Sequence, residues 1–485
     1  MSHLLDLSIS QLQAGLKKGE WSAVEITQAY LDRIAKLDFK IKAYLQVTKT
    51  LALSQAKVID KKITHGEKLG NLFGIPVSIK DVLMTKDIVT TGASKILQNY
   101  LPPYNATAVE RLLAADAIIL GKTNCDEFAM GASGENSAWQ ITHNPWNEKC
   151  VPGGSSSGSA AAVAAQECRV SLGSDTAGSI RQPASFCGLV GAKPTYGRVS
   201  RYGLIAMASS FDTVGPLAST VKEAAQVLQV IAGHDPCDST SQKQTVPDYV
   251  KLLEQEPKRL RIGVAREFFA QGLDSKVGKV VDQAVAEIQK LGHQVSEVSL
   301  PNMSLGVATY YIITPAEVSA NLARYDGLRY GQAVDSQSLF EFYTKTRGQF
   351  LGSEVKRRII LGTYVLSAGY YDAYYRKAVL AREAIKNDFK KVFDKVDVVV
   401  GPTTPTMAFA LGEKTADPLA MYLADINTVP VNIAGIPAVS LPCGLSNGLP
   451  VGLQLIGPAW SEGLLFQLAQ AYETARGPLP IPTFK

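Results

Sequence analysis

The chain has 485 residues, of which 46% are apolar and 19% charged, and 49 basic against 44 acidic residues give a net charge of +5. This composition is typical of a globular protein with a large core, and so mild a charge neither requires nor excludes a nucleic-acid partner. The six cysteines form no CxxC pair or Cys/His cluster, which argues against a zinc site and against a secreted disulfide framework.

The N-terminal region is predicted to be helical and to lack a targeting segment. Apolar residues recur at helical spacing through residues 9–38, and Ser22, with Glu25 three residues later, has the pattern of a capping box. The first ten residues lack the basic and apolar regions of a signal peptide, and no apolar run reaches the length of a membrane span. We therefore expect a cytoplasmic protein with reduced thiols.

Short apolar segments alternate with helical patterns along the rest of the chain. Each segment ends near Gly, Asp or Pro, as buried strands do. Strands interleaved with helices predict an α/β fold with a sheet covered by helices on both faces. The segments are 74–81, 116–124, 169–175, 260–267, 397–405, 438–444 and 450–457.

The simplest domain organisation is a single domain over residues 1–485. The polar stretch 233–249 is the best candidate for a boundary, but it is short and isolated, so we interpret it as a surface loop. Helical patterns dominate afterwards and suggest an insertion. The predicted parts are an N-terminal helical region (1–65), a core (66–230), a mainly helical insertion (250–395) and a final part (396–485) that completes the sheet and ends in a helix.

Residues 152–165, PGGSSSGSAAAVAA, place glycines and serines before an alanine-rich helical segment. A flexible linker has no reason to start a helix, and a phosphate-binding loop would need a lysine that does not follow here. Gly154–Gly158 matches the GxSxG nucleophile elbow with Ser156 as nucleophile, but a loop precedes it instead of a strand. Only His234 and His293 follow it, and neither lies where a Ser-His-Asp site needs its base. The base must therefore be another residue.

Two further segments can supply a base and an anion-binding turn. In segment 74–81, period-2 alternation places Lys80 on the face opposite to Val77 and Ile79. Desolvation at the end of such a strand would lower the pKa of this lysine and make its neutral amine available; the alternative is a lysine that extends to solvent. In the turn 176–179, successive N–H groups can converge on an oxyanion; the alternative is an ordinary capped loop.

Together the three segments resemble the amidase signature family. The matching stretches are GIPVSIKD (74–81), PGGSSSGSAAA (152–162) and GSDTAGSIRQPASFCGLVGAKPTYG (173–197). Lys80 lies 99 residues before Ser179 (179 − 80). The resemblance implies a large mixed β-sheet with helices on both faces, a helical insertion in the second half, and a Ser–cis-Ser–Lys catalytic unit.

By position, the resemblance implies that Ser179 is the nucleophile, Ser155 the bridging serine on a cis peptide, and Lys80 the base. Ser155 can accept a proton from Ser179 and pass one to the neutral amine. The implied oxyanion hole consists of the backbone N–H groups of Thr176, Ala177, Gly178 and Ser179. The sequence departs from the family pattern at Ser157 and Ala177, which both stand where a glycine is usual.

Segments outside this signature resemble the glutaminase subunits of tRNA-dependent amidotransferases. Examples are EVKRRIILGTYVLSAGYYDAYYRKA (354–378) and YLADINTVPVNIAGIPAVSLPCG (422–444). The resemblance implies a heterotrimer with B and C subunits, in which ammonia from glutamine reaches the B subunit. That partner would use ATP and Mg²⁺ to amidate Glu-tRNA(Gln) and, in many bacteria, Asp-tRNA(Asn). We expect no cofactor or metal in the present chain.

The same resemblance implies four substrate-binding residues. Arg358 would hold the α-carboxylate of glutamine through its guanidinium fork, and Asp425 would hold the α-ammonium. Tyr310 and Ser133 are further candidates for the pocket. Two alternatives stay open, a stand-alone amidase acting on small carboxamides and a catalytically inactive scaffold or RNA-binding subunit, and the intact catalytic set argues against the second.

Overall fold

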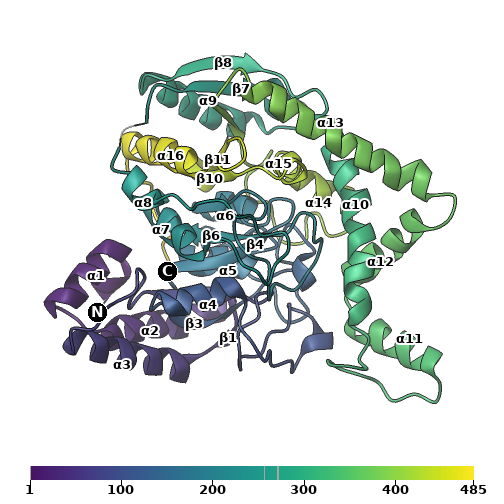
Figure 1. The fold of residues 1–485 in the computed structure, drawn as a ribbon, viewed down its shortest axis with the longest axis horizontal. Coiled ribbons are helices and arrows are strands. Elements are labelled where there is room, and N and C mark those ends of the chain that lie inside the picture. The colour runs from purple at the N-terminus through teal and green to yellow at the C-terminus, as the bar shows by residue number, and fades with distance from the viewer. Residues whose placement is uncertain (1, 256, 270–271, 485) are drawn as a thin grey trace.

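The computed structural model describes residues 2–255, 257–269 and 272–484 (Figure 1). In this part of the chain one 11-stranded sheet has the strand order β1-β3-β2-β4-β6-β5-β10-β11-β9-β7-β8. Parallel pairs such as β2–β4 and antiparallel pairs such as β4–β6 make it a mixed sheet. The strands are β1 (Tyr44–Val47), β2 (Pro76–Lys80), β3 (Ile118–Thr123), β4 (Val170–Asp175), β5 (Val190–Lys193), β6 (Thr213–Ala218), β7 (Arg261–Ala265), β8 (Gln294–Val298), β9 (Val398–Pro402), β10 (Ala438–Ser446) and β11 (Leu449–Ile456).

Helices surround this sheet, and every residue of β2, β3 and β4 is buried, so both faces of these central strands are covered. The predicted α/β class with a large mixed sheet is therefore confirmed. The helices are α1 (Ile9–Lys18), α2 (Ala23–Ile41), α3 (Lys49–Thr64), α4 (Thr107–Ala114), α5 (Ser157–Ala164), α6 (Arg181–Cys187), α7 (Val221–Ile231), α8 (Tyr249–Leu252), α9 (Ser275–Lys290), α10 (Gly306–Asn321), α11 (Leu339–Phe350), α12 (Ser353–Leu366), α13 (Arg376–Phe393), α14 (Pro418–Tyr422), α15 (Val429–Ala434) and α16 (Glu462–Arg476).

All seven segments predicted as strands contain one, and four strands were missed. The missed β1 and β5 have only four residues each, β6 contains both glycine and proline, and β8 is largely exposed at the edge of the sheet. Such strands lack the continuous apolar run by which a buried strand is recognised. Residues 250–395 contribute β7 and β8 as well as helices α10 to α13, which line the right-hand side of Figure 1.

Local signals predicted the N-terminal helices correctly. Ser22 caps α2, and it forms the expected capping box with Glu25. The alanine-rich segment lies in helix α5, which begins at Ser157, the last residue of the serine run. Among the described residues, no helix is long and apolar enough to cross a membrane.

The central strands bring two distant segments to one edge of the sheet. β2 and β4 are parallel neighbours, with Ser78 opposite Ser171. Because parallel strands end at the same edge, the residues that follow β4 lie beside Lys80, the last residue of β2. Helix α5 packs against both strands. The Gly-Ser run that precedes α5 therefore reaches the same edge.

Candidate active site

Lys80 is fully buried and surrounded by serine hydroxyls. Its Nζ lies 2.7 Å from Ser155 Oγ, 3.0 Å from Ser156 Oγ and 2.9 Å from Ser174 Oγ. The alternative of a lysine that extends to solvent is therefore wrong. The strand aims this amine at the serine run, as the alternation in segment 74–81 predicts.

Burial lowers the pKa of Lys80 to about 8, because removing the ammonium from water costs more than removing the neutral amine. The buried groups around it, Cys125 first and then Asp126, Asp175 and Asp212, oppose this shift only in part. About a tenth of Lys80 is consequently unprotonated at pH 7, far more than for a solvated lysine, and this neutral amine can act as a base.

The Gly154–Ser155 peptide bond is cis. Its surroundings hold it on three sides: Gly154 N donates to Gln182 Oε1 at 2.9 Å, Ser155 O accepts from Asp126 N at 3.3 Å, and Ser156 N donates to Ser179 O at 3.2 Å. The last contact joins the serine run to the residue predicted as the nucleophile. The segment is thus a fixed part of the site.

The side chains of Ser156 and Ser157 make contacts that hold the start of α5 in place. Ser156 Oγ donates to Ser174 O at 3.2 Å and accepts from Ser174 N at 3.3 Å, so this hydroxyl ties the start of α5 to β4. Ser157 is buried at the first position of α5 and packs against Gly134, where a Cβ would lie 2.5 Å from the Ser157 Cβ. Ser157 therefore fills space next to a glycine.

The turn after β4 presents unpaired backbone donors. Within the described ranges, the N–H groups of residues 176–179 donate to no protein acceptor, and the Ser179 hydroxyl has no hydrogen-bond partner. Gly178 has a φ of 147°, a conformation that side chains disfavour. Ala177 has a negative φ, so the glycine usual at this position is not needed for the turn. Such free donors suit a developing oxyanion.

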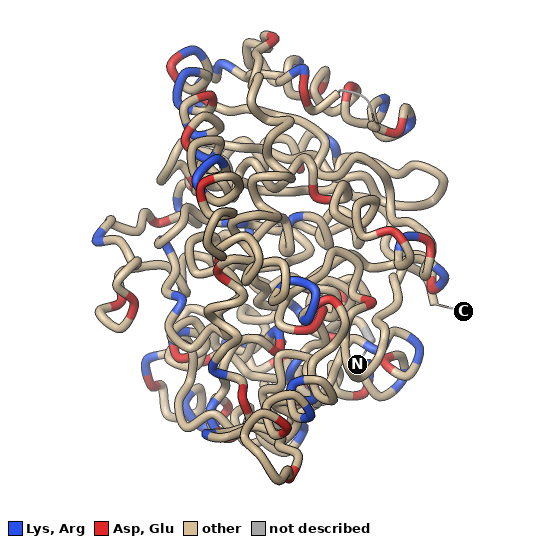
Figure 2. The backbone as a smooth tube through the Cα atoms, turned by 90° about the vertical axis from the view of Figure 1, so that its right-hand side faces the viewer, with Lys and Arg blue, Asp and Glu red and all other residues tan. Residues whose placement is uncertain are grey.

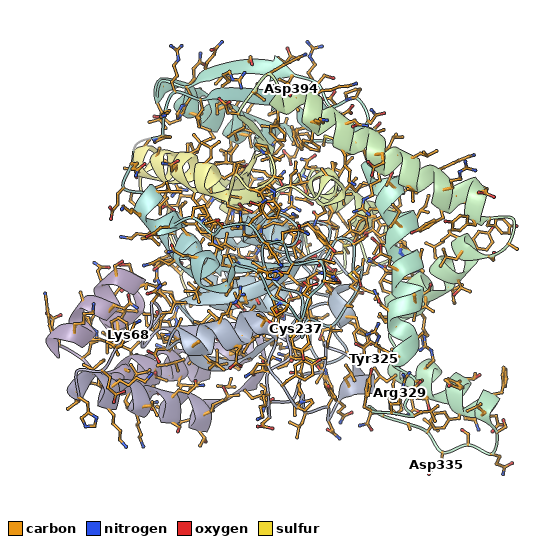
Figure 3. All side chains as sticks on the ribbon, viewed as in Figure 1. Lys68, Cys237, Tyr325, Arg329, Asp335 and Asp394 are labelled. Carbon is orange, nitrogen blue, oxygen red and sulfur yellow. The ribbon has the colours of Figure 1, made fainter. Side chains whose placement is uncertain are left out.

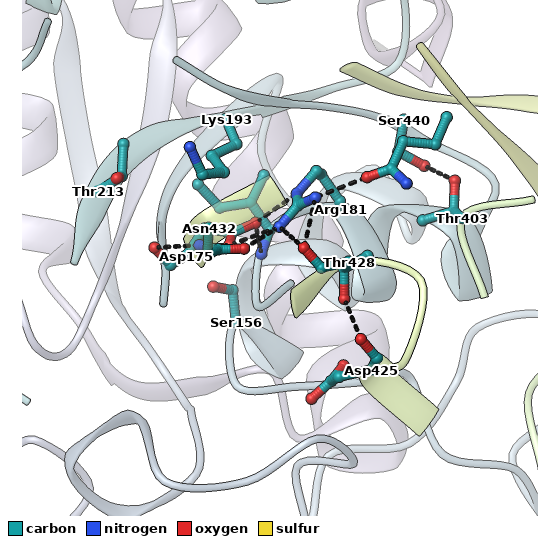
Figure 4. Close-up of polar contacts among 12 residues, drawn as sticks. Ser156, Asp175, Arg181, Lys193, Thr213, Thr403, Asp425, Thr428, Asn432 and Ser440 are labelled. Atoms are coloured by element: carbon teal, nitrogen blue, oxygen red, sulfur yellow. Dashed lines mark hydrogen bonds and ion pairs between the residues drawn. The ribbon is translucent and has the colours of Figure 1, made fainter. Parts of the chain in front are cut away.

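Arg181 fixes Asp175, the residue that precedes this turn (Figure 4). Its Nε and Nη2 lie 3.0 and 3.1 Å from the carboxylate of Asp175, and the guanidinium also donates to Gln454, Asn432 and the carbonyl of Thr428. Burial alone would raise the pKa of Asp175, but Arg181 holds it down at about 2. The network joins β4 to the segment 428–454, and the sequence reasoning missed it because its members are far apart in the chain.

A cavity of about 60 Å³ lies between two loops (residues 131–136 and 414–415) and helices α12 and α14. Arg358 and Ser133 both line it. Arg358 Nε donates to Glu354 Oε1 at 2.8 Å, and its guanidinium carbon lies 5.2 and 5.8 Å from the ring centres of Tyr311 and Tyr422. Its Nη atoms have no partner among the described residues. Two nitrogens of a fixed guanidinium are thus free for an anion. The sequence did not predict a place in this site for Glu354, Tyr311 and Tyr422.

Asp425 lies beside the turn 176–179. Its Oδ1 is buried without a hydrogen-bond partner, and a Cβ on Gly178 would lie 3.3 Å from it. Burial raises the pKa of Asp425 well above its ordinary value. Tyr310 is also buried, but it packs edge-on against Tyr311 behind the cavity, with ring centres 5.0 Å apart, and Tyr311 is the residue that lines the cavity.

A sequence model described as Amidase matches residues 25–466. The chain belongs to the amidase family. This confirms the resemblance inferred from the three signature segments. As a member of this family, the chain is 57% identical to the A subunit of glutamyl-tRNA(Gln) amidotransferase from Microcystis aeruginosa, over 96% of this chain and 97% of the relative. It is 58% identical to the protein of the same name from Nostoc punctiforme, with the same coverage.

Solved structures of other amidase-family proteins have the same fold. The crystal structure of the A subunit of glutamyl-tRNA(Gln) amidotransferase from Thermotoga maritima is 39% identical, with a TM-score of 0.81 over 100% of this amidase-family chain and 97% of that one. The native peptide amidase from Stenotrophomonas maltophilia is 32% identical, with a TM-score of 0.81 over 98% of each chain. Both share the fold of this chain, although their names describe different activities.

Proposed function

We propose that this chain is the glutaminase subunit of a tRNA-dependent amidotransferase. It would hydrolyse glutamine and supply ammonia for the conversion of Glu-tRNA(Gln), with Asp-tRNA(Asn) as a second candidate substrate of the complex. The observation that carries the proposal is the combination of the Lys80–Ser155 pair with the free guanidinium nitrogens of Arg358 and the unpartnered Oδ1 of Asp425, two groups suited to the α-carboxylate and α-ammonium of a free amino acid. The names of the relatives that are 56 to 58% identical support it.

In the proposed reaction, Ser179 Oγ attacks the side-chain amide carbon of glutamine. Its proton passes through the Ser155 hydroxyl to the neutral amine of Lys80. The N–H groups of residues 176–179 would stabilise the tetrahedral oxyanion, where loss of one donor typically costs about a hundredfold or more.

The intermediate then collapses to an acyl ester on Ser179. The proton held by Lys80 returns through Ser155 to the leaving nitrogen, and ammonia departs. Water next attacks the ester and gives its proton to the same relay, which releases glutamate and restores the Ser179 hydroxyl.

The charged pair would orient the substrate. The two free Nη atoms of Arg358 match the two oxygens of an α-carboxylate, and the unpaired Oδ1 of Asp425 can accept from the α-ammonium. Ser133 lines the same cavity and is proposed as a weaker contact. Tyr310 would act only by supporting Tyr311, since it lies behind the cavity wall.

We also propose B and C subunits as partners in the cytoplasm, with ATP and Mg²⁺ bound by the B subunit. Exposed apolar side chains on α11, α12 and α13 support a protein partner: Phe340 is 80% exposed, Ile360 71% and Leu380 63%. Basic and acidic residues alternate over the side of the molecule seen in Figure 2, which fits a protein partner better than a phosphate backbone.

The proposal is tested by assaying glutamine hydrolysis by the chain alone and after co-purification with its partner subunits, with and without Glu-tRNA. We expect glutamate formation that rises sharply in the complex with charged tRNA, and its loss in Ser179→Ala with assembly intact. The fold shared with the peptide amidase favours a stand-alone amidase as second candidate. Equal turnover of simple carboxamides by the isolated chain would support that candidate instead.

A further inference from the structure

Asp126 and Glu127 are neighbours in the chain that make contacts on opposite sides. Asp126 contacts the proposed catalytic residues, because its backbone N–H donates to the Ser155 carbonyl. Its carboxylate accepts from Gly134 N and Asn136 N at 3.0 Å each. Asp126 therefore connects the cis peptide to the loop that carries Ser133.

Glu127 faces the helical part of the second half of the chain. Its Oε1 accepts from Ser94 Oγ at 2.5 Å and its Oε2 accepts from Gly352 N at 2.9 Å. Gly352 is the N-cap residue of α12, and a Cβ at this position would collide with Glu127 Oε2. Because the first N–H groups of a helix lack internal acceptors, a carboxylate there fixes the start of the helix.

The backbone directly after Glu127 adopts a strained conformation next to the contact between Glu127 and Gly352 N. The next two residues, Phe128 and Ala129, have φ values of 49° and 62°, which cost energy for residues other than glycine. Phe128 stacks on Tyr325, with ring centres 4.8 Å apart, and Tyr325 lies near the lower end of α10 in Figure 3. The turn is thus held in place on both sides of Glu127.

Helix α12 carries Glu354, Arg357 and Arg358, which line one side of the substrate cavity. Glu354 lies two residues after Gly352, and it accepts from Arg358 Nε at 2.8 Å and from Tyr422 Oη at 3.1 Å. A shift at the start of α12 would therefore move the Arg358 guanidinium relative to the catalytic serines. No other contact in the described residues joins a carboxylate of the catalytic core to the N-cap of this helix.

We propose that Glu127 is a positioning residue, which fixes the start of α12 against the catalytic core and so sets the distance from Arg358 to Ser179. This inference rests on the proposed function in that Arg358 binds the α-carboxylate of glutamine. Glu127 itself lies outside the substrate cavity.

The test compares two substrates in the full complex with its partner subunits. Glutamine carries the α-carboxylate, whereas butanamide presents the same amide without either α-group. We expect Glu127→Ala to raise KM for glutamine about tenfold or more and to leave kcat/KM for butanamide within about twofold of the wild type.

In an Arg358→Ala background, Glu127→Ala should cause no further loss with glutamine. Glu127→Gln keeps one acceptor oxygen and should be intermediate; it replaces the alanine variant if that variant does not fold.

A matched control removes the N-cap side chain of α11, the helix that precedes α12. Ser338 caps α11 by accepting from Glu341 N, and α11 does not line the cavity. Ser338→Ala should therefore leave the ratio of the two substrates unchanged. Equal losses with glutamine and butanamide in the Glu127 variants, or losses additive with Arg358→Ala, would overturn the inference. If the wild-type complex hydrolyses butanamide but not glutamine, the proposed function itself is contradicted.

Discussion

Gly178 lies against Thr428 so closely that a Cβ at position 178 would collide with the Thr428 hydroxyl. We expect Gly178→Ala to displace the turn 176–179 and to lower kcat for amide hydrolysis by about a hundredfold or more, because the oxyanion donors lose their alignment. Steady-state kinetics on the folded variant measure this loss. Ala177→Gly is the matched control, since Ala177 has a negative φ, and it should keep kcat within a few-fold. An equal loss in both variants would contradict a special need for glycine at position 178.

Two of the three hydroxyls around Lys80, those of Ser155 and Ser156, are expected to differ in role. Ser155→Ala should lower kcat by about 10² to 10⁴, because it breaks the proposed proton relay. Ser156→Ala removes bonds to Ser174 N and O, so it should lower the free energy of unfolding by about 1–3 kcal/mol and affect kcat less. Kinetics and denaturant unfolding of the two variants separate these effects. If Ser156→Ala proved the more damaging to kcat, the relay would have to run through Ser156.

The pKa of Lys80, lowered by burial to about 8, predicts a pH dependence. Below this pH the amine is protonated and cannot accept the Ser179 proton, so kcat/KM should rise with pH through about 8 and then level off. Lys80→Arg keeps the charge but does not deprotonate in this range, so it should be inactive at every pH. The pH–rate profile of glutamine hydrolysis provides the measurement. A profile that is flat from about pH 6 to 9 would exclude Lys80 as the base.

Asp425 is expected to select for the α-ammonium of glutamine. Asp425→Asn keeps the size of the side chain and removes the carboxyl group that can ionise beside the α-ammonium. The variant should lose about tenfold or more in kcat/KM for glutamine, while hydrolysis of 5-amino-5-oxopentanoate, which lacks the α-amino group, should change little. Parallel assays with both amides test this. A comparable loss with both would place Asp425 in the support of the oxyanion turn instead.

The exposed apolar face of α12 predicts an effect on assembly. Ile360 is 71% exposed, and we expect Ile360→Asp to weaken co-purification with the partner subunits while leaving the thermal unfolding of this chain unchanged. Phe39→Asp on α2 is a matched control, because Phe39 is 69% exposed on a different part of the molecule. Pull-down at equal concentrations compares them. Unchanged capture of the partners by Ile360→Asp would contradict the use of this face.

Local signals in the sequence predicted much of the fold. Continuous apolar runs such as residues 397–405 define buried strands, and the Ser22–Glu25 pair defines the start of a helix, because these patterns depend on neighbours in the chain. Strand β8 was missed for the opposite reason: its residues are mostly exposed, and pairing with β7 keeps it in the sheet.

The candidate site was predictable where a motif carries it. The resemblance carried by the signature segments implied Lys80, Ser155 and Ser179, and the structure places Lys80 against Ser155 and joins Ser179 to the same serine run. Arg181 and Glu354 were not predicted, since a charged side chain in the sequence does not reveal whether it is solvated or buried. Their partners come from strands and helices that only the tertiary fold brings together.

The anchoring of Arg181 also bears on when the protein becomes active during its synthesis. Lys80, Ser155 and Ser179 all lie within the first 179 residues to be synthesised. The Arg181 guanidinium, however, needs Thr428, Asn432 and Gln454 as acceptors. Until those residues emerge, this buried cation lacks most of its acceptors and the turn lacks its support. A nascent chain therefore contains every proposed catalytic side chain well before it contains the residues that complete the hydrogen bonds of Arg181.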